Sequence, residues 1–319
     1  MEHRWTQLVI TLFWLATMTW LTVEKILPPL RRGEPPSFRS VYGNVDAFNR
    51  PIVWSVTWNG SPMGWATTQA THPTAGMTEI NSHVHFSRIP VEEMAPIWMR
   101  GVVHSAISPL GEQIEMDAYN RMEIDPLNRL TAFRSSIRIS SVPQEIVMQG
   151  AVEGSLLKLR VDAGELSYNT ERYMPHDALI GDELSPQAQM PGLHSGQSWT
   201  VPIYNPLRPP DSPMEILQAS VEGPESIIWN GDSASALVVV YRSDSGAAFG
   251  SSNSSRGKMW VDATGMVLRQ EIDLLGSKLA FNRLPEGKLP HVFVESDDSD
   301  AKTAFEEAMK EALSRRTHD

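Results

Sequence analysis

From residue 52 onward, the chain consists of short segments in which apolar and polar residues alternate, separated by residues that favour turns. Asn59-Gly60 and Asn230-Gly231 each separate two such segments, and this dipeptide is typical of two-residue β-hairpin turns. Segments of this kind lie at 53–57, 63–68, 78–89, 113–124, 130–139, 145–153, 156–161, 165–173, 199–204, 215–221, 226–229, 234–241, 259–262, 266–273 and 278–283. Strands joined by hairpin-sized connections favour an antiparallel meander, because a parallel sheet needs long crossovers. We therefore predict a mainly β fold: a curved antiparallel β-meander, or half-barrel, over residues 52–284.

Helical periodicity is rare in this sequence. The stretches 91–105 and 177–189 are short candidates, and 300–316 is the clearest. The apolar residues of this last stretch form one stripe at helical spacing: Ala304, Phe305, Ala308, Met309, Ala312 and Leu313. We expect this C-terminal amphipathic helix, which belongs to an acidic tail at 285–319, to pack on its own domain.

The segment 175–195 is rich in proline, glycine and polar residues. Such a stretch is either a joint between domains or a long functional loop. The meander is accordingly either one large curved sheet or two smaller β units that meet near 175–195.

The N-terminus carries an uncharged apolar run, residues 8–23, which reads LVITLFWLATMTWLTV. Counted from Trp5, the segment is about 19 residues long, near the lower end of what spans a bilayer. Basic residues lie on both sides of the run, so the positive-inside bias does not fix its orientation. No cleavage site of small residues follows it. We therefore predict an uncleaved signal anchor, a transmembrane helix within 1–27, and then a proline-rich linker at 28–51.

Composition and charge exclude several classes of function. The 319 residues are 41% hydrophobic and 20% charged, which is ordinary for a globular protein. A net charge of −11 repels nucleic-acid phosphates, so we expect no nucleic-acid partner. The chain has no cysteine, which excludes disulfides, thiolate metal ligands and cysteine nucleophiles.

Two short motifs are candidates for chemistry. His83 and His85 alternate on a predicted strand, which puts both imidazoles on one face, as a metal pair requires. A third ligand at a supporting spacing is missing, so we interpret both as polar residues on a solvated face and predict no metal. Gly231-Asp232-Ser233 resembles part of a hydrolase nucleophile motif, but it lies in a predicted hairpin turn and not in a strand-to-helix elbow. We predict no catalytic residue, no cofactor and no enzymatic activity.

Tryptophans are the remaining candidates for a binding site. The chain has 10 tryptophans and 15 methionines, and Trp54, Trp58 and Trp65 cluster in the first predicted hairpin. Together with Trp199 they form our candidate ligand-binding set. In a curved sheet these side chains either line a concave apolar groove for an acyl chain or fill a closed core. The sequence leaves both alternatives open.

Three blocks resemble passages of a known group of proteins: the first predicted hairpin at 54–65, LHSGQSWTVPIYNP at 193–206 and MWVDATGMVLR at 259–269. They are similar to strand-and-turn passages of exported β-rich proteins of the DUF3108 and lipoprotein-carrier-like group, and of the β region that precedes bacterial transglutaminase-like domains. The resemblance spans residues 52–284. It implies a half-barrel of antiparallel strands with a helix against its concave face, on the outer side of a bacterial inner membrane. It carries over no catalytic residue, because the transglutaminase-like domains act through a cysteine that this chain lacks.

We therefore expect a non-enzymatic cell-envelope protein with a single span in the bacterial inner membrane and its C-terminal domain in the periplasm. The β domain is expected to bind a lipid-like or other apolar ligand. The alternative is a structural or scaffolding subunit of an envelope protein complex, with the helix at 300–316 or the segment 175–195 as the contact.

Overall fold

The computed structural model describes residues 2–22, 36, 50–73, 76–87, 114–127, 129–140, 142–173, 181–182, 184–204, 214–243, 255–274, 276–288, 303, 305–307 and 309–310. These residues contain helix α1 (Glu2–Leu21) and fifteen strands. The strands are β1 (Ile52–Trp58), β2 (Ser61–Thr71), β3 (Thr78–Phe86), β4 (Met116–Ile124), β5 (Leu130–Ile139), β6 (Ile146–Glu153), β7 (Leu156–Ala163), β8 (Leu166–Tyr173), β9 (Gly181–Asp182), β10 (Ser198–Tyr204), β11 (Met214–Trp229), β12 (Asp232–Ser243), β13 (Ser255–Val261), β14 (Val267–Leu274) and β15 (Ser277–Arg283).

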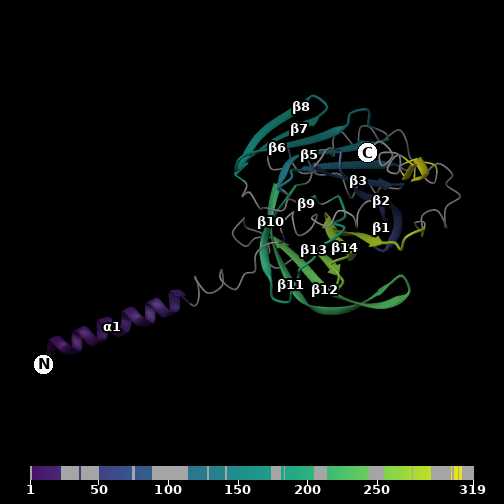
Figure 1. The fold of residues 1–319 in the computed structure, drawn as a ribbon. Helices are drawn as coiled ribbons and strands as arrows, with labels where there is room; N and C mark the ends of the chain where they lie inside the picture. The colour runs from purple at the N-terminus through teal and green to yellow at the C-terminus, as the bar shows by residue number, and fades with distance from the viewer. Residues whose placement is uncertain are drawn as a thin grey trace.

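The described strands form one sheet, in the order β8-β7-β6-β5-β4-β3-β2-β1-β15-β14-β13-β12-β11-β10-β9. Neighbouring strands pair antiparallel, except that β9 pairs parallel with β10. The pair β1–β15 joins a first wing, β1–β8, to a second wing, β9–β15. Figure 1 shows the two wings curving toward each other around a shared interior. The predicted curved antiparallel meander is confirmed, and it forms one continuous sheet.

Both predicted Asn-Gly hairpins are present. Asn59 and Gly60 connect β1 to β2, and Asn230 and Gly231 connect β11 to β12, all four with positive φ angles. A two-residue turn of this type needs positive φ at both central positions, which asparagine and glycine tolerate best. These two turns fix the register of the hairpins on either side of them.

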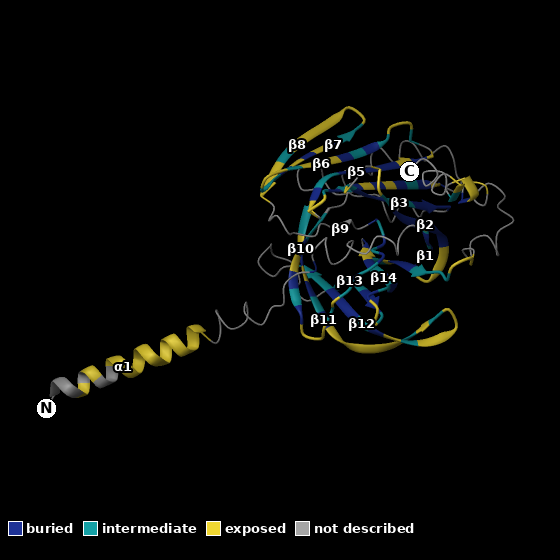
Figure 2. Cartoon of the chain, in the orientation of Figure 1, coloured by how far each residue is buried: buried dark blue, intermediate teal, exposed yellow. Residues whose placement is uncertain are grey.

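Side chains alternate along each strand, so the sheet has an inner and an outer face. On β1, the side chains of Ile52, Trp54, Val56 and Trp58 are buried in one apolar cluster, which includes inner-face side chains of both wings. Figure 2 shows this burial in the middle strands, whereas β8 and the tip of the β11–β12 hairpin are exposed. Each fully buried large apolar side chain contributes about 1.5–3 kcal/mol, so this shared interior stabilises both wings.

A strap of extended chain, residues 184–190, lies across the inner face. Its side chains of Leu184, Ala188 and Met190 are buried in the core. The Thr68 hydroxyl donates to the Pro186 carbonyl at 3.4 Å, and Arg283 donates to the Ala188 carbonyl at 3.0 Å. The strap therefore ties β2 of the first wing to β15 of the second.

The strap corrects one prediction. We expected a short helix over 177–189, but residues 184–189 are not helical. Pro186 has no N–H to donate and disfavours helical geometry at the preceding residue. The Gln187 N–H instead donates to the Gln270 side chain on β14 at 2.9 Å. Residues 177–180 and the predicted helix at 91–105 lie outside the described residues.

The C-terminal helix is confirmed where the structure describes it, at residues 303, 305–307 and 309–310. Phe305 is 5% exposed and packs edge-on against the Trp65 ring, with the ring centroids 5.2 Å apart. Trp65 lies on the outer face, because it pairs with Ser55 and not with Trp54. The helix therefore packs on its own domain, as its apolar stripe predicts, and it covers the outer face of β2.

Helix α1 lies where a transmembrane helix was expected, within 1–27. Among the described residues, no helix combines the length and the apolar character needed to cross a membrane. Glu2, His3, Arg4 and Gln7 occupy the first two turns of α1, which shortens its apolar run. The predicted linker at 28–51 lies almost entirely outside the described residues.

Candidate functional site

The structure divides the four candidate tryptophans between the two faces of the sheet. Trp54, Trp58 and Trp199 are buried in the inner-face core. Trp65 is fully buried on the outer face, since its neighbour Ala66 takes the inner position opposite Trp54. Within the part of the chain that the structure describes, the buried indole N–H groups of Trp54 and Trp199 have no hydrogen-bond partner. A ligand-binding role for these side chains stays a prediction.

A partly enclosed inner cavity of about 70 Å³ lies between the strap and strands β10–β14. Its apolar lining consists mainly of Met190, Val201, Leu217, Tyr241, Met259 and Ile272. Gly257 lies directly opposite Tyr241 in the ladder, and a Cβ there would lie 2.7 Å from the Glu271 carbonyl oxygen, so only glycine fits this close approach. Burial raises the pKa of Tyr241 above its ordinary value, so its hydroxyl stays protonated and can donate a hydrogen bond.

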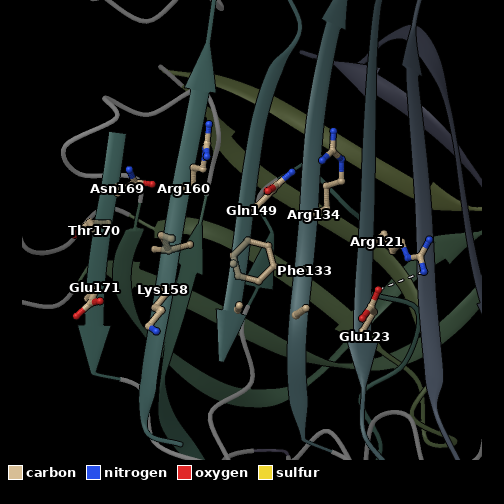
Figure 3. A pocket seen from close by; sticks show the side chains of 14 residues that line it. Arg121, Glu123, Phe133, Arg134, Gln149, Lys158, Arg160, Asn169, Thr170 and Glu171 are labelled. Atoms are coloured by element: carbon tan, nitrogen blue, oxygen red, sulfur yellow. Dashed lines mark ion pairs between the residues drawn. The ribbon is translucent and has the colours of Figure 1, made fainter. Parts of the chain in front are cut away.

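A larger depression, the outer trough, crosses strands β4–β8 on the outer face and has a volume of about 910 Å³ (Figure 3). One wall is a cross-strand row of Arg121, Arg134, Gln149, Arg160 and Asn169. The other wall is the row of Glu123, Ala132, Ala151, Lys158 and Glu171. Phe133 and Gly150 lie between the rows along the strands but face the core, where the Phe133 ring fills the space that a side chain at Gly150 would need.

Ion pairs compensate most of the charges around the outer trough. Arg121 pairs with Glu79 at 2.6 Å and with Glu123 at 3.3 Å. Arg160 pairs with Asp162 at 2.8 Å, and Lys158 pairs with Glu153 at 2.6 Å.

Arg134 differs from these side chains, because it forms no ion pair within the part of the chain that the structure describes. Its charge acts on Asp162 at longer range. Hydrogen bonds from Arg160 and Ser167, together with the charges of Arg160 and Arg134, lower the pKa of Asp162.

A polar cluster lies on the same outer face, on β2–β4. Asp117 Oδ1 accepts hydrogen bonds from His83 Nε2 at 2.8 Å and from His85 Nδ1 at 3.0 Å. Trp65 stacks on His85, and Tyr119 stacks on His83. Burial alone would raise the pKa of Asp117, but the hydrogen bonds from the two histidines outweigh burial and lower the pKa well below its ordinary value.

The placement of both imidazoles on one face is confirmed, but their interpretation as residues of a solvated face is wrong for His85. That side chain is 4% exposed, and its buried Nε2 has no hydrogen-bond partner among the described residues. Sequence reasoning missed Asp117, because the pairing of β3 with β4 brings it beside His85. Across the described residues, no group of three or more His, Asp or Glu side chains has an arrangement that holds a metal ion.

The cluster lacks a visible nucleophile. Neither imidazole is hydrogen-bonded to a serine or threonine hydroxyl of the described residues. Ser233, from the motif that resembles a nucleophile block, follows the β11–β12 turn and is hydrogen-bonded to Ser226 at 2.8 Å. The hairpin interpretation of that motif is confirmed.

Comparison with known proteins yields likeness of fold. No family model and no curated protein sequence matches the chain. A β-barrel-like protein of the domain of unknown function DUF1849 from Brucella abortus is similar in structure, with a TM-score of 0.44 and 7% sequence identity over 73% of this chain and 95% of that one. A DUF1089 family protein from Pseudomonas aeruginosa has a TM-score of 0.32 and 13% identity over 65% of this chain and 88% of that one. The resemblance to the DUF3108 group stays a prediction.

Proposed function

We propose that the protein is a non-enzymatic binding protein of the cell envelope that takes an apolar group of its ligand into the inner cavity. The observation that carries this proposal is the cavity itself, which is lined by Val201, Leu217, Met259 and other apolar side chains. A concave, mostly apolar pocket with a few polar groups is the usual form of a small-molecule site. The polar residues of the lining include Gln187 and Gln270, and further polar residues contribute to it: Ser185, Arg256, Lys258 and Glu271.

The size of the cavity limits the ligand. A volume of about 70 Å³ is roughly half that of the ~150 Å³ apolar cavity that accepts benzene in another protein. The bound group is therefore short, unless the strap moves away from β14. The strap is held by hydrogen bonds to Thr68, Gln270 and Arg283. Its apolar side chains are also buried in the core, so such a movement would expose apolar surface.

The polar groups of the lining add a second requirement. Gln187 and Gln270 lie in the wall of the cavity, and their amide groups can both donate and accept hydrogen bonds. A ligand that carries an oxygen beside its apolar group can form hydrogen bonds with them. A medium-chain alcohol or a lipid-like molecule has that composition.

Calorimetric titration of the full-length protein with 1-octanol tests this proposal. We expect saturable binding, and we expect Leu217→Phe to weaken it at least tenfold, because the larger ring fills the cavity. Leu279→Phe is the matched control: it enlarges a fully buried core side chain that does not line the cavity. Absence of saturable binding, or equal losses in both variants, would contradict the proposal.

Helix α1 favours a second candidate function, that of a structural subunit of an envelope complex. Large apolar side chains such as Phe13 (73% exposed) and Trp14 (57% exposed) lie on its surface. Apolar surface of this extent on a helix marks an interaction site. If this candidate is right, the full-length chain isolated from its native membranes in mild detergent co-purifies with one partner protein in a fixed ratio. The double substitution Phe13→Ser with Trp14→Ser then abolishes the recovery of that partner. Recovery of a lone chain would argue against it.

A further inference from the structure

The outer trough contains an electrostatic arrangement that the fold does not need. Arg121 and Arg134 lie directly opposite each other on β4 and β5. Like charges in this position destabilise an antiparallel ladder. Glu79 and Glu123 compensate the charge of Arg121, whereas Arg134 forms no ion pair within the described residues.

A second guanidinium group, that of Arg160, continues the row. Strands lie about 4.8 Å apart, so Arg134 and Arg160, two strands from each other, are separated by about 10 Å at the backbone. In Figure 3, Arg134 and Arg160 extend in the same direction from their strands, with Gln149 between them. The three side chains present hydrogen-bond donors along one line.

The floor of the outer trough leaves room for a ligand beside these donors. Ala132 and Ala151 project only methyl groups on the opposite wall. A guanidinium group binds a carboxylate or a phosphate through two parallel hydrogen bonds, which makes arginine the preferred partner of such groups. Glu123 and Glu171 lie at the two ends of the opposite wall and repel a long polyanion such as a nucleic acid.

We propose that the outer trough is a binding site for a small ligand with two oxyanion groups, phosphate or carboxylate, held by Arg134 and Arg160 with Gln149 between them. The site is independent of the inner cavity, because the two lie on opposite faces and on different wings of the sheet. Arg134 makes the central contact, since it alone of the basic side chains that line the outer trough forms no ion pair with a described residue.

Titration of the full-length protein with inorganic pyrophosphate and, separately, with glutarate tests the site. We expect saturable binding of at least one of them at low salt, weakened as the ionic strength rises. Arg134→Gln should weaken it at least tenfold. Arg138→Gln is the matched control, because Arg138 is an exposed arginine on the same strand and the same face but outside the outer trough.

The two probes distinguish a phosphate ligand from a carboxylate ligand. Binding of pyrophosphate alone assigns the site to phosphate, and binding of glutarate alone assigns it to carboxylate. The proposal is overturned if neither probe binds, or if Arg138→Gln weakens binding as much as Arg134→Gln does. A thermal melt of each variant confirms that a loss of binding does not come from a loss of folded protein.

Discussion

The two wings share one interior but differ in the polarity of the side chains on their outer faces. The first wing exposes a ladder of charged and polar side chains on β4–β8, with Arg134 and Gln149 open to solvent. The second wing carries a separate apolar cluster on its outer face, with Val238, Trp260 and Leu268 buried in it. A sheet that is polar outside on one wing and apolar outside on the other needs a cover for the apolar part.

The long β11–β12 hairpin provides that cover. Its ladder changes register between Val221 and Pro224, and such irregularities bend a strand. Beyond the bend, Ile227 and Trp229 pack on the apolar cluster, and Trp229 Nε1 donates to the Arg283 carbonyl on β15 at 2.9 Å. The second wing thus closes its outer face with its own chain, while the first wing leaves a face where a ligand can reach the strands.

The largest expected effect comes from the covered face. Trp260→Ala removes a buried ring and the hydrogen bond that its indole N–H donates to Glu225. We expect the free energy of unfolding to fall by about 3–5 kcal/mol, measured by urea denaturation. Gln149→Ala on the open face of the first wing is the comparison, and we expect a change within about 0.5 kcal/mol. Similar losses in both variants would mean that the two outer faces do not differ as described.

The polar cluster on β2–β4 predicts a smaller effect that depends on pH. Because the pKa of Asp117 is lower in the folded protein than in the unfolded chain, its carboxylate stabilises the fold above about pH 4, and this stabilisation is lost as the pH falls further. Asp117→Asn should cost about 1.5–3 kcal/mol at neutral pH, the usual contribution of hydrogen bonds to a charged group. It should also make the free energy of unfolding less dependent on pH on the acid side. Asp232→Asn removes an exposed carboxylate and controls for net charge; an unchanged pH dependence on the acid side in Asp117→Asn would refute this account.

The smallest effect concerns Arg134 in the protein without ligand. Arg134→Gln removes one member of the opposed arginine pair. We expect thermal denaturation to show unchanged stability or a gain of up to about 0.5 kcal/mol, because a repulsive cross-strand contact disappears. A clear loss of stability would show that Arg134 is a structural residue of the first wing.

Local chemistry made much of the fold predictable. The alternation of β1 and β2 around Asn59-Gly60 encodes both strands and their turn, since the turn geometry depends only on neighbouring residues. The side chain of Phe305 could likewise be assigned to a buried helical stripe from its spacing alone.

Contacts between distant segments could not be predicted in this way. No local pattern indicates that β1 pairs with β15, that Asp117 lies beside two histidines, or that the strap crosses the interior. The outer trough could not be predicted from the sequence either, because each of its walls combines single side chains from five strands. Trp65 looked like a partner of Trp54 in sequence, but the register placed the two on opposite faces.

The pairing of β1 with β15 has a consequence for synthesis. The first strand to leave the ribosome finds its second neighbour only after every other described strand has been made. Until then one edge of β1 is bare, and Trp54 and Val56 face an unfinished interior. Such delayed, long-range closure slows folding and leaves an intermediate that is prone to aggregate. Nascent chains halted before residue 277 should therefore depend on chaperones in a way that the completed protein does not.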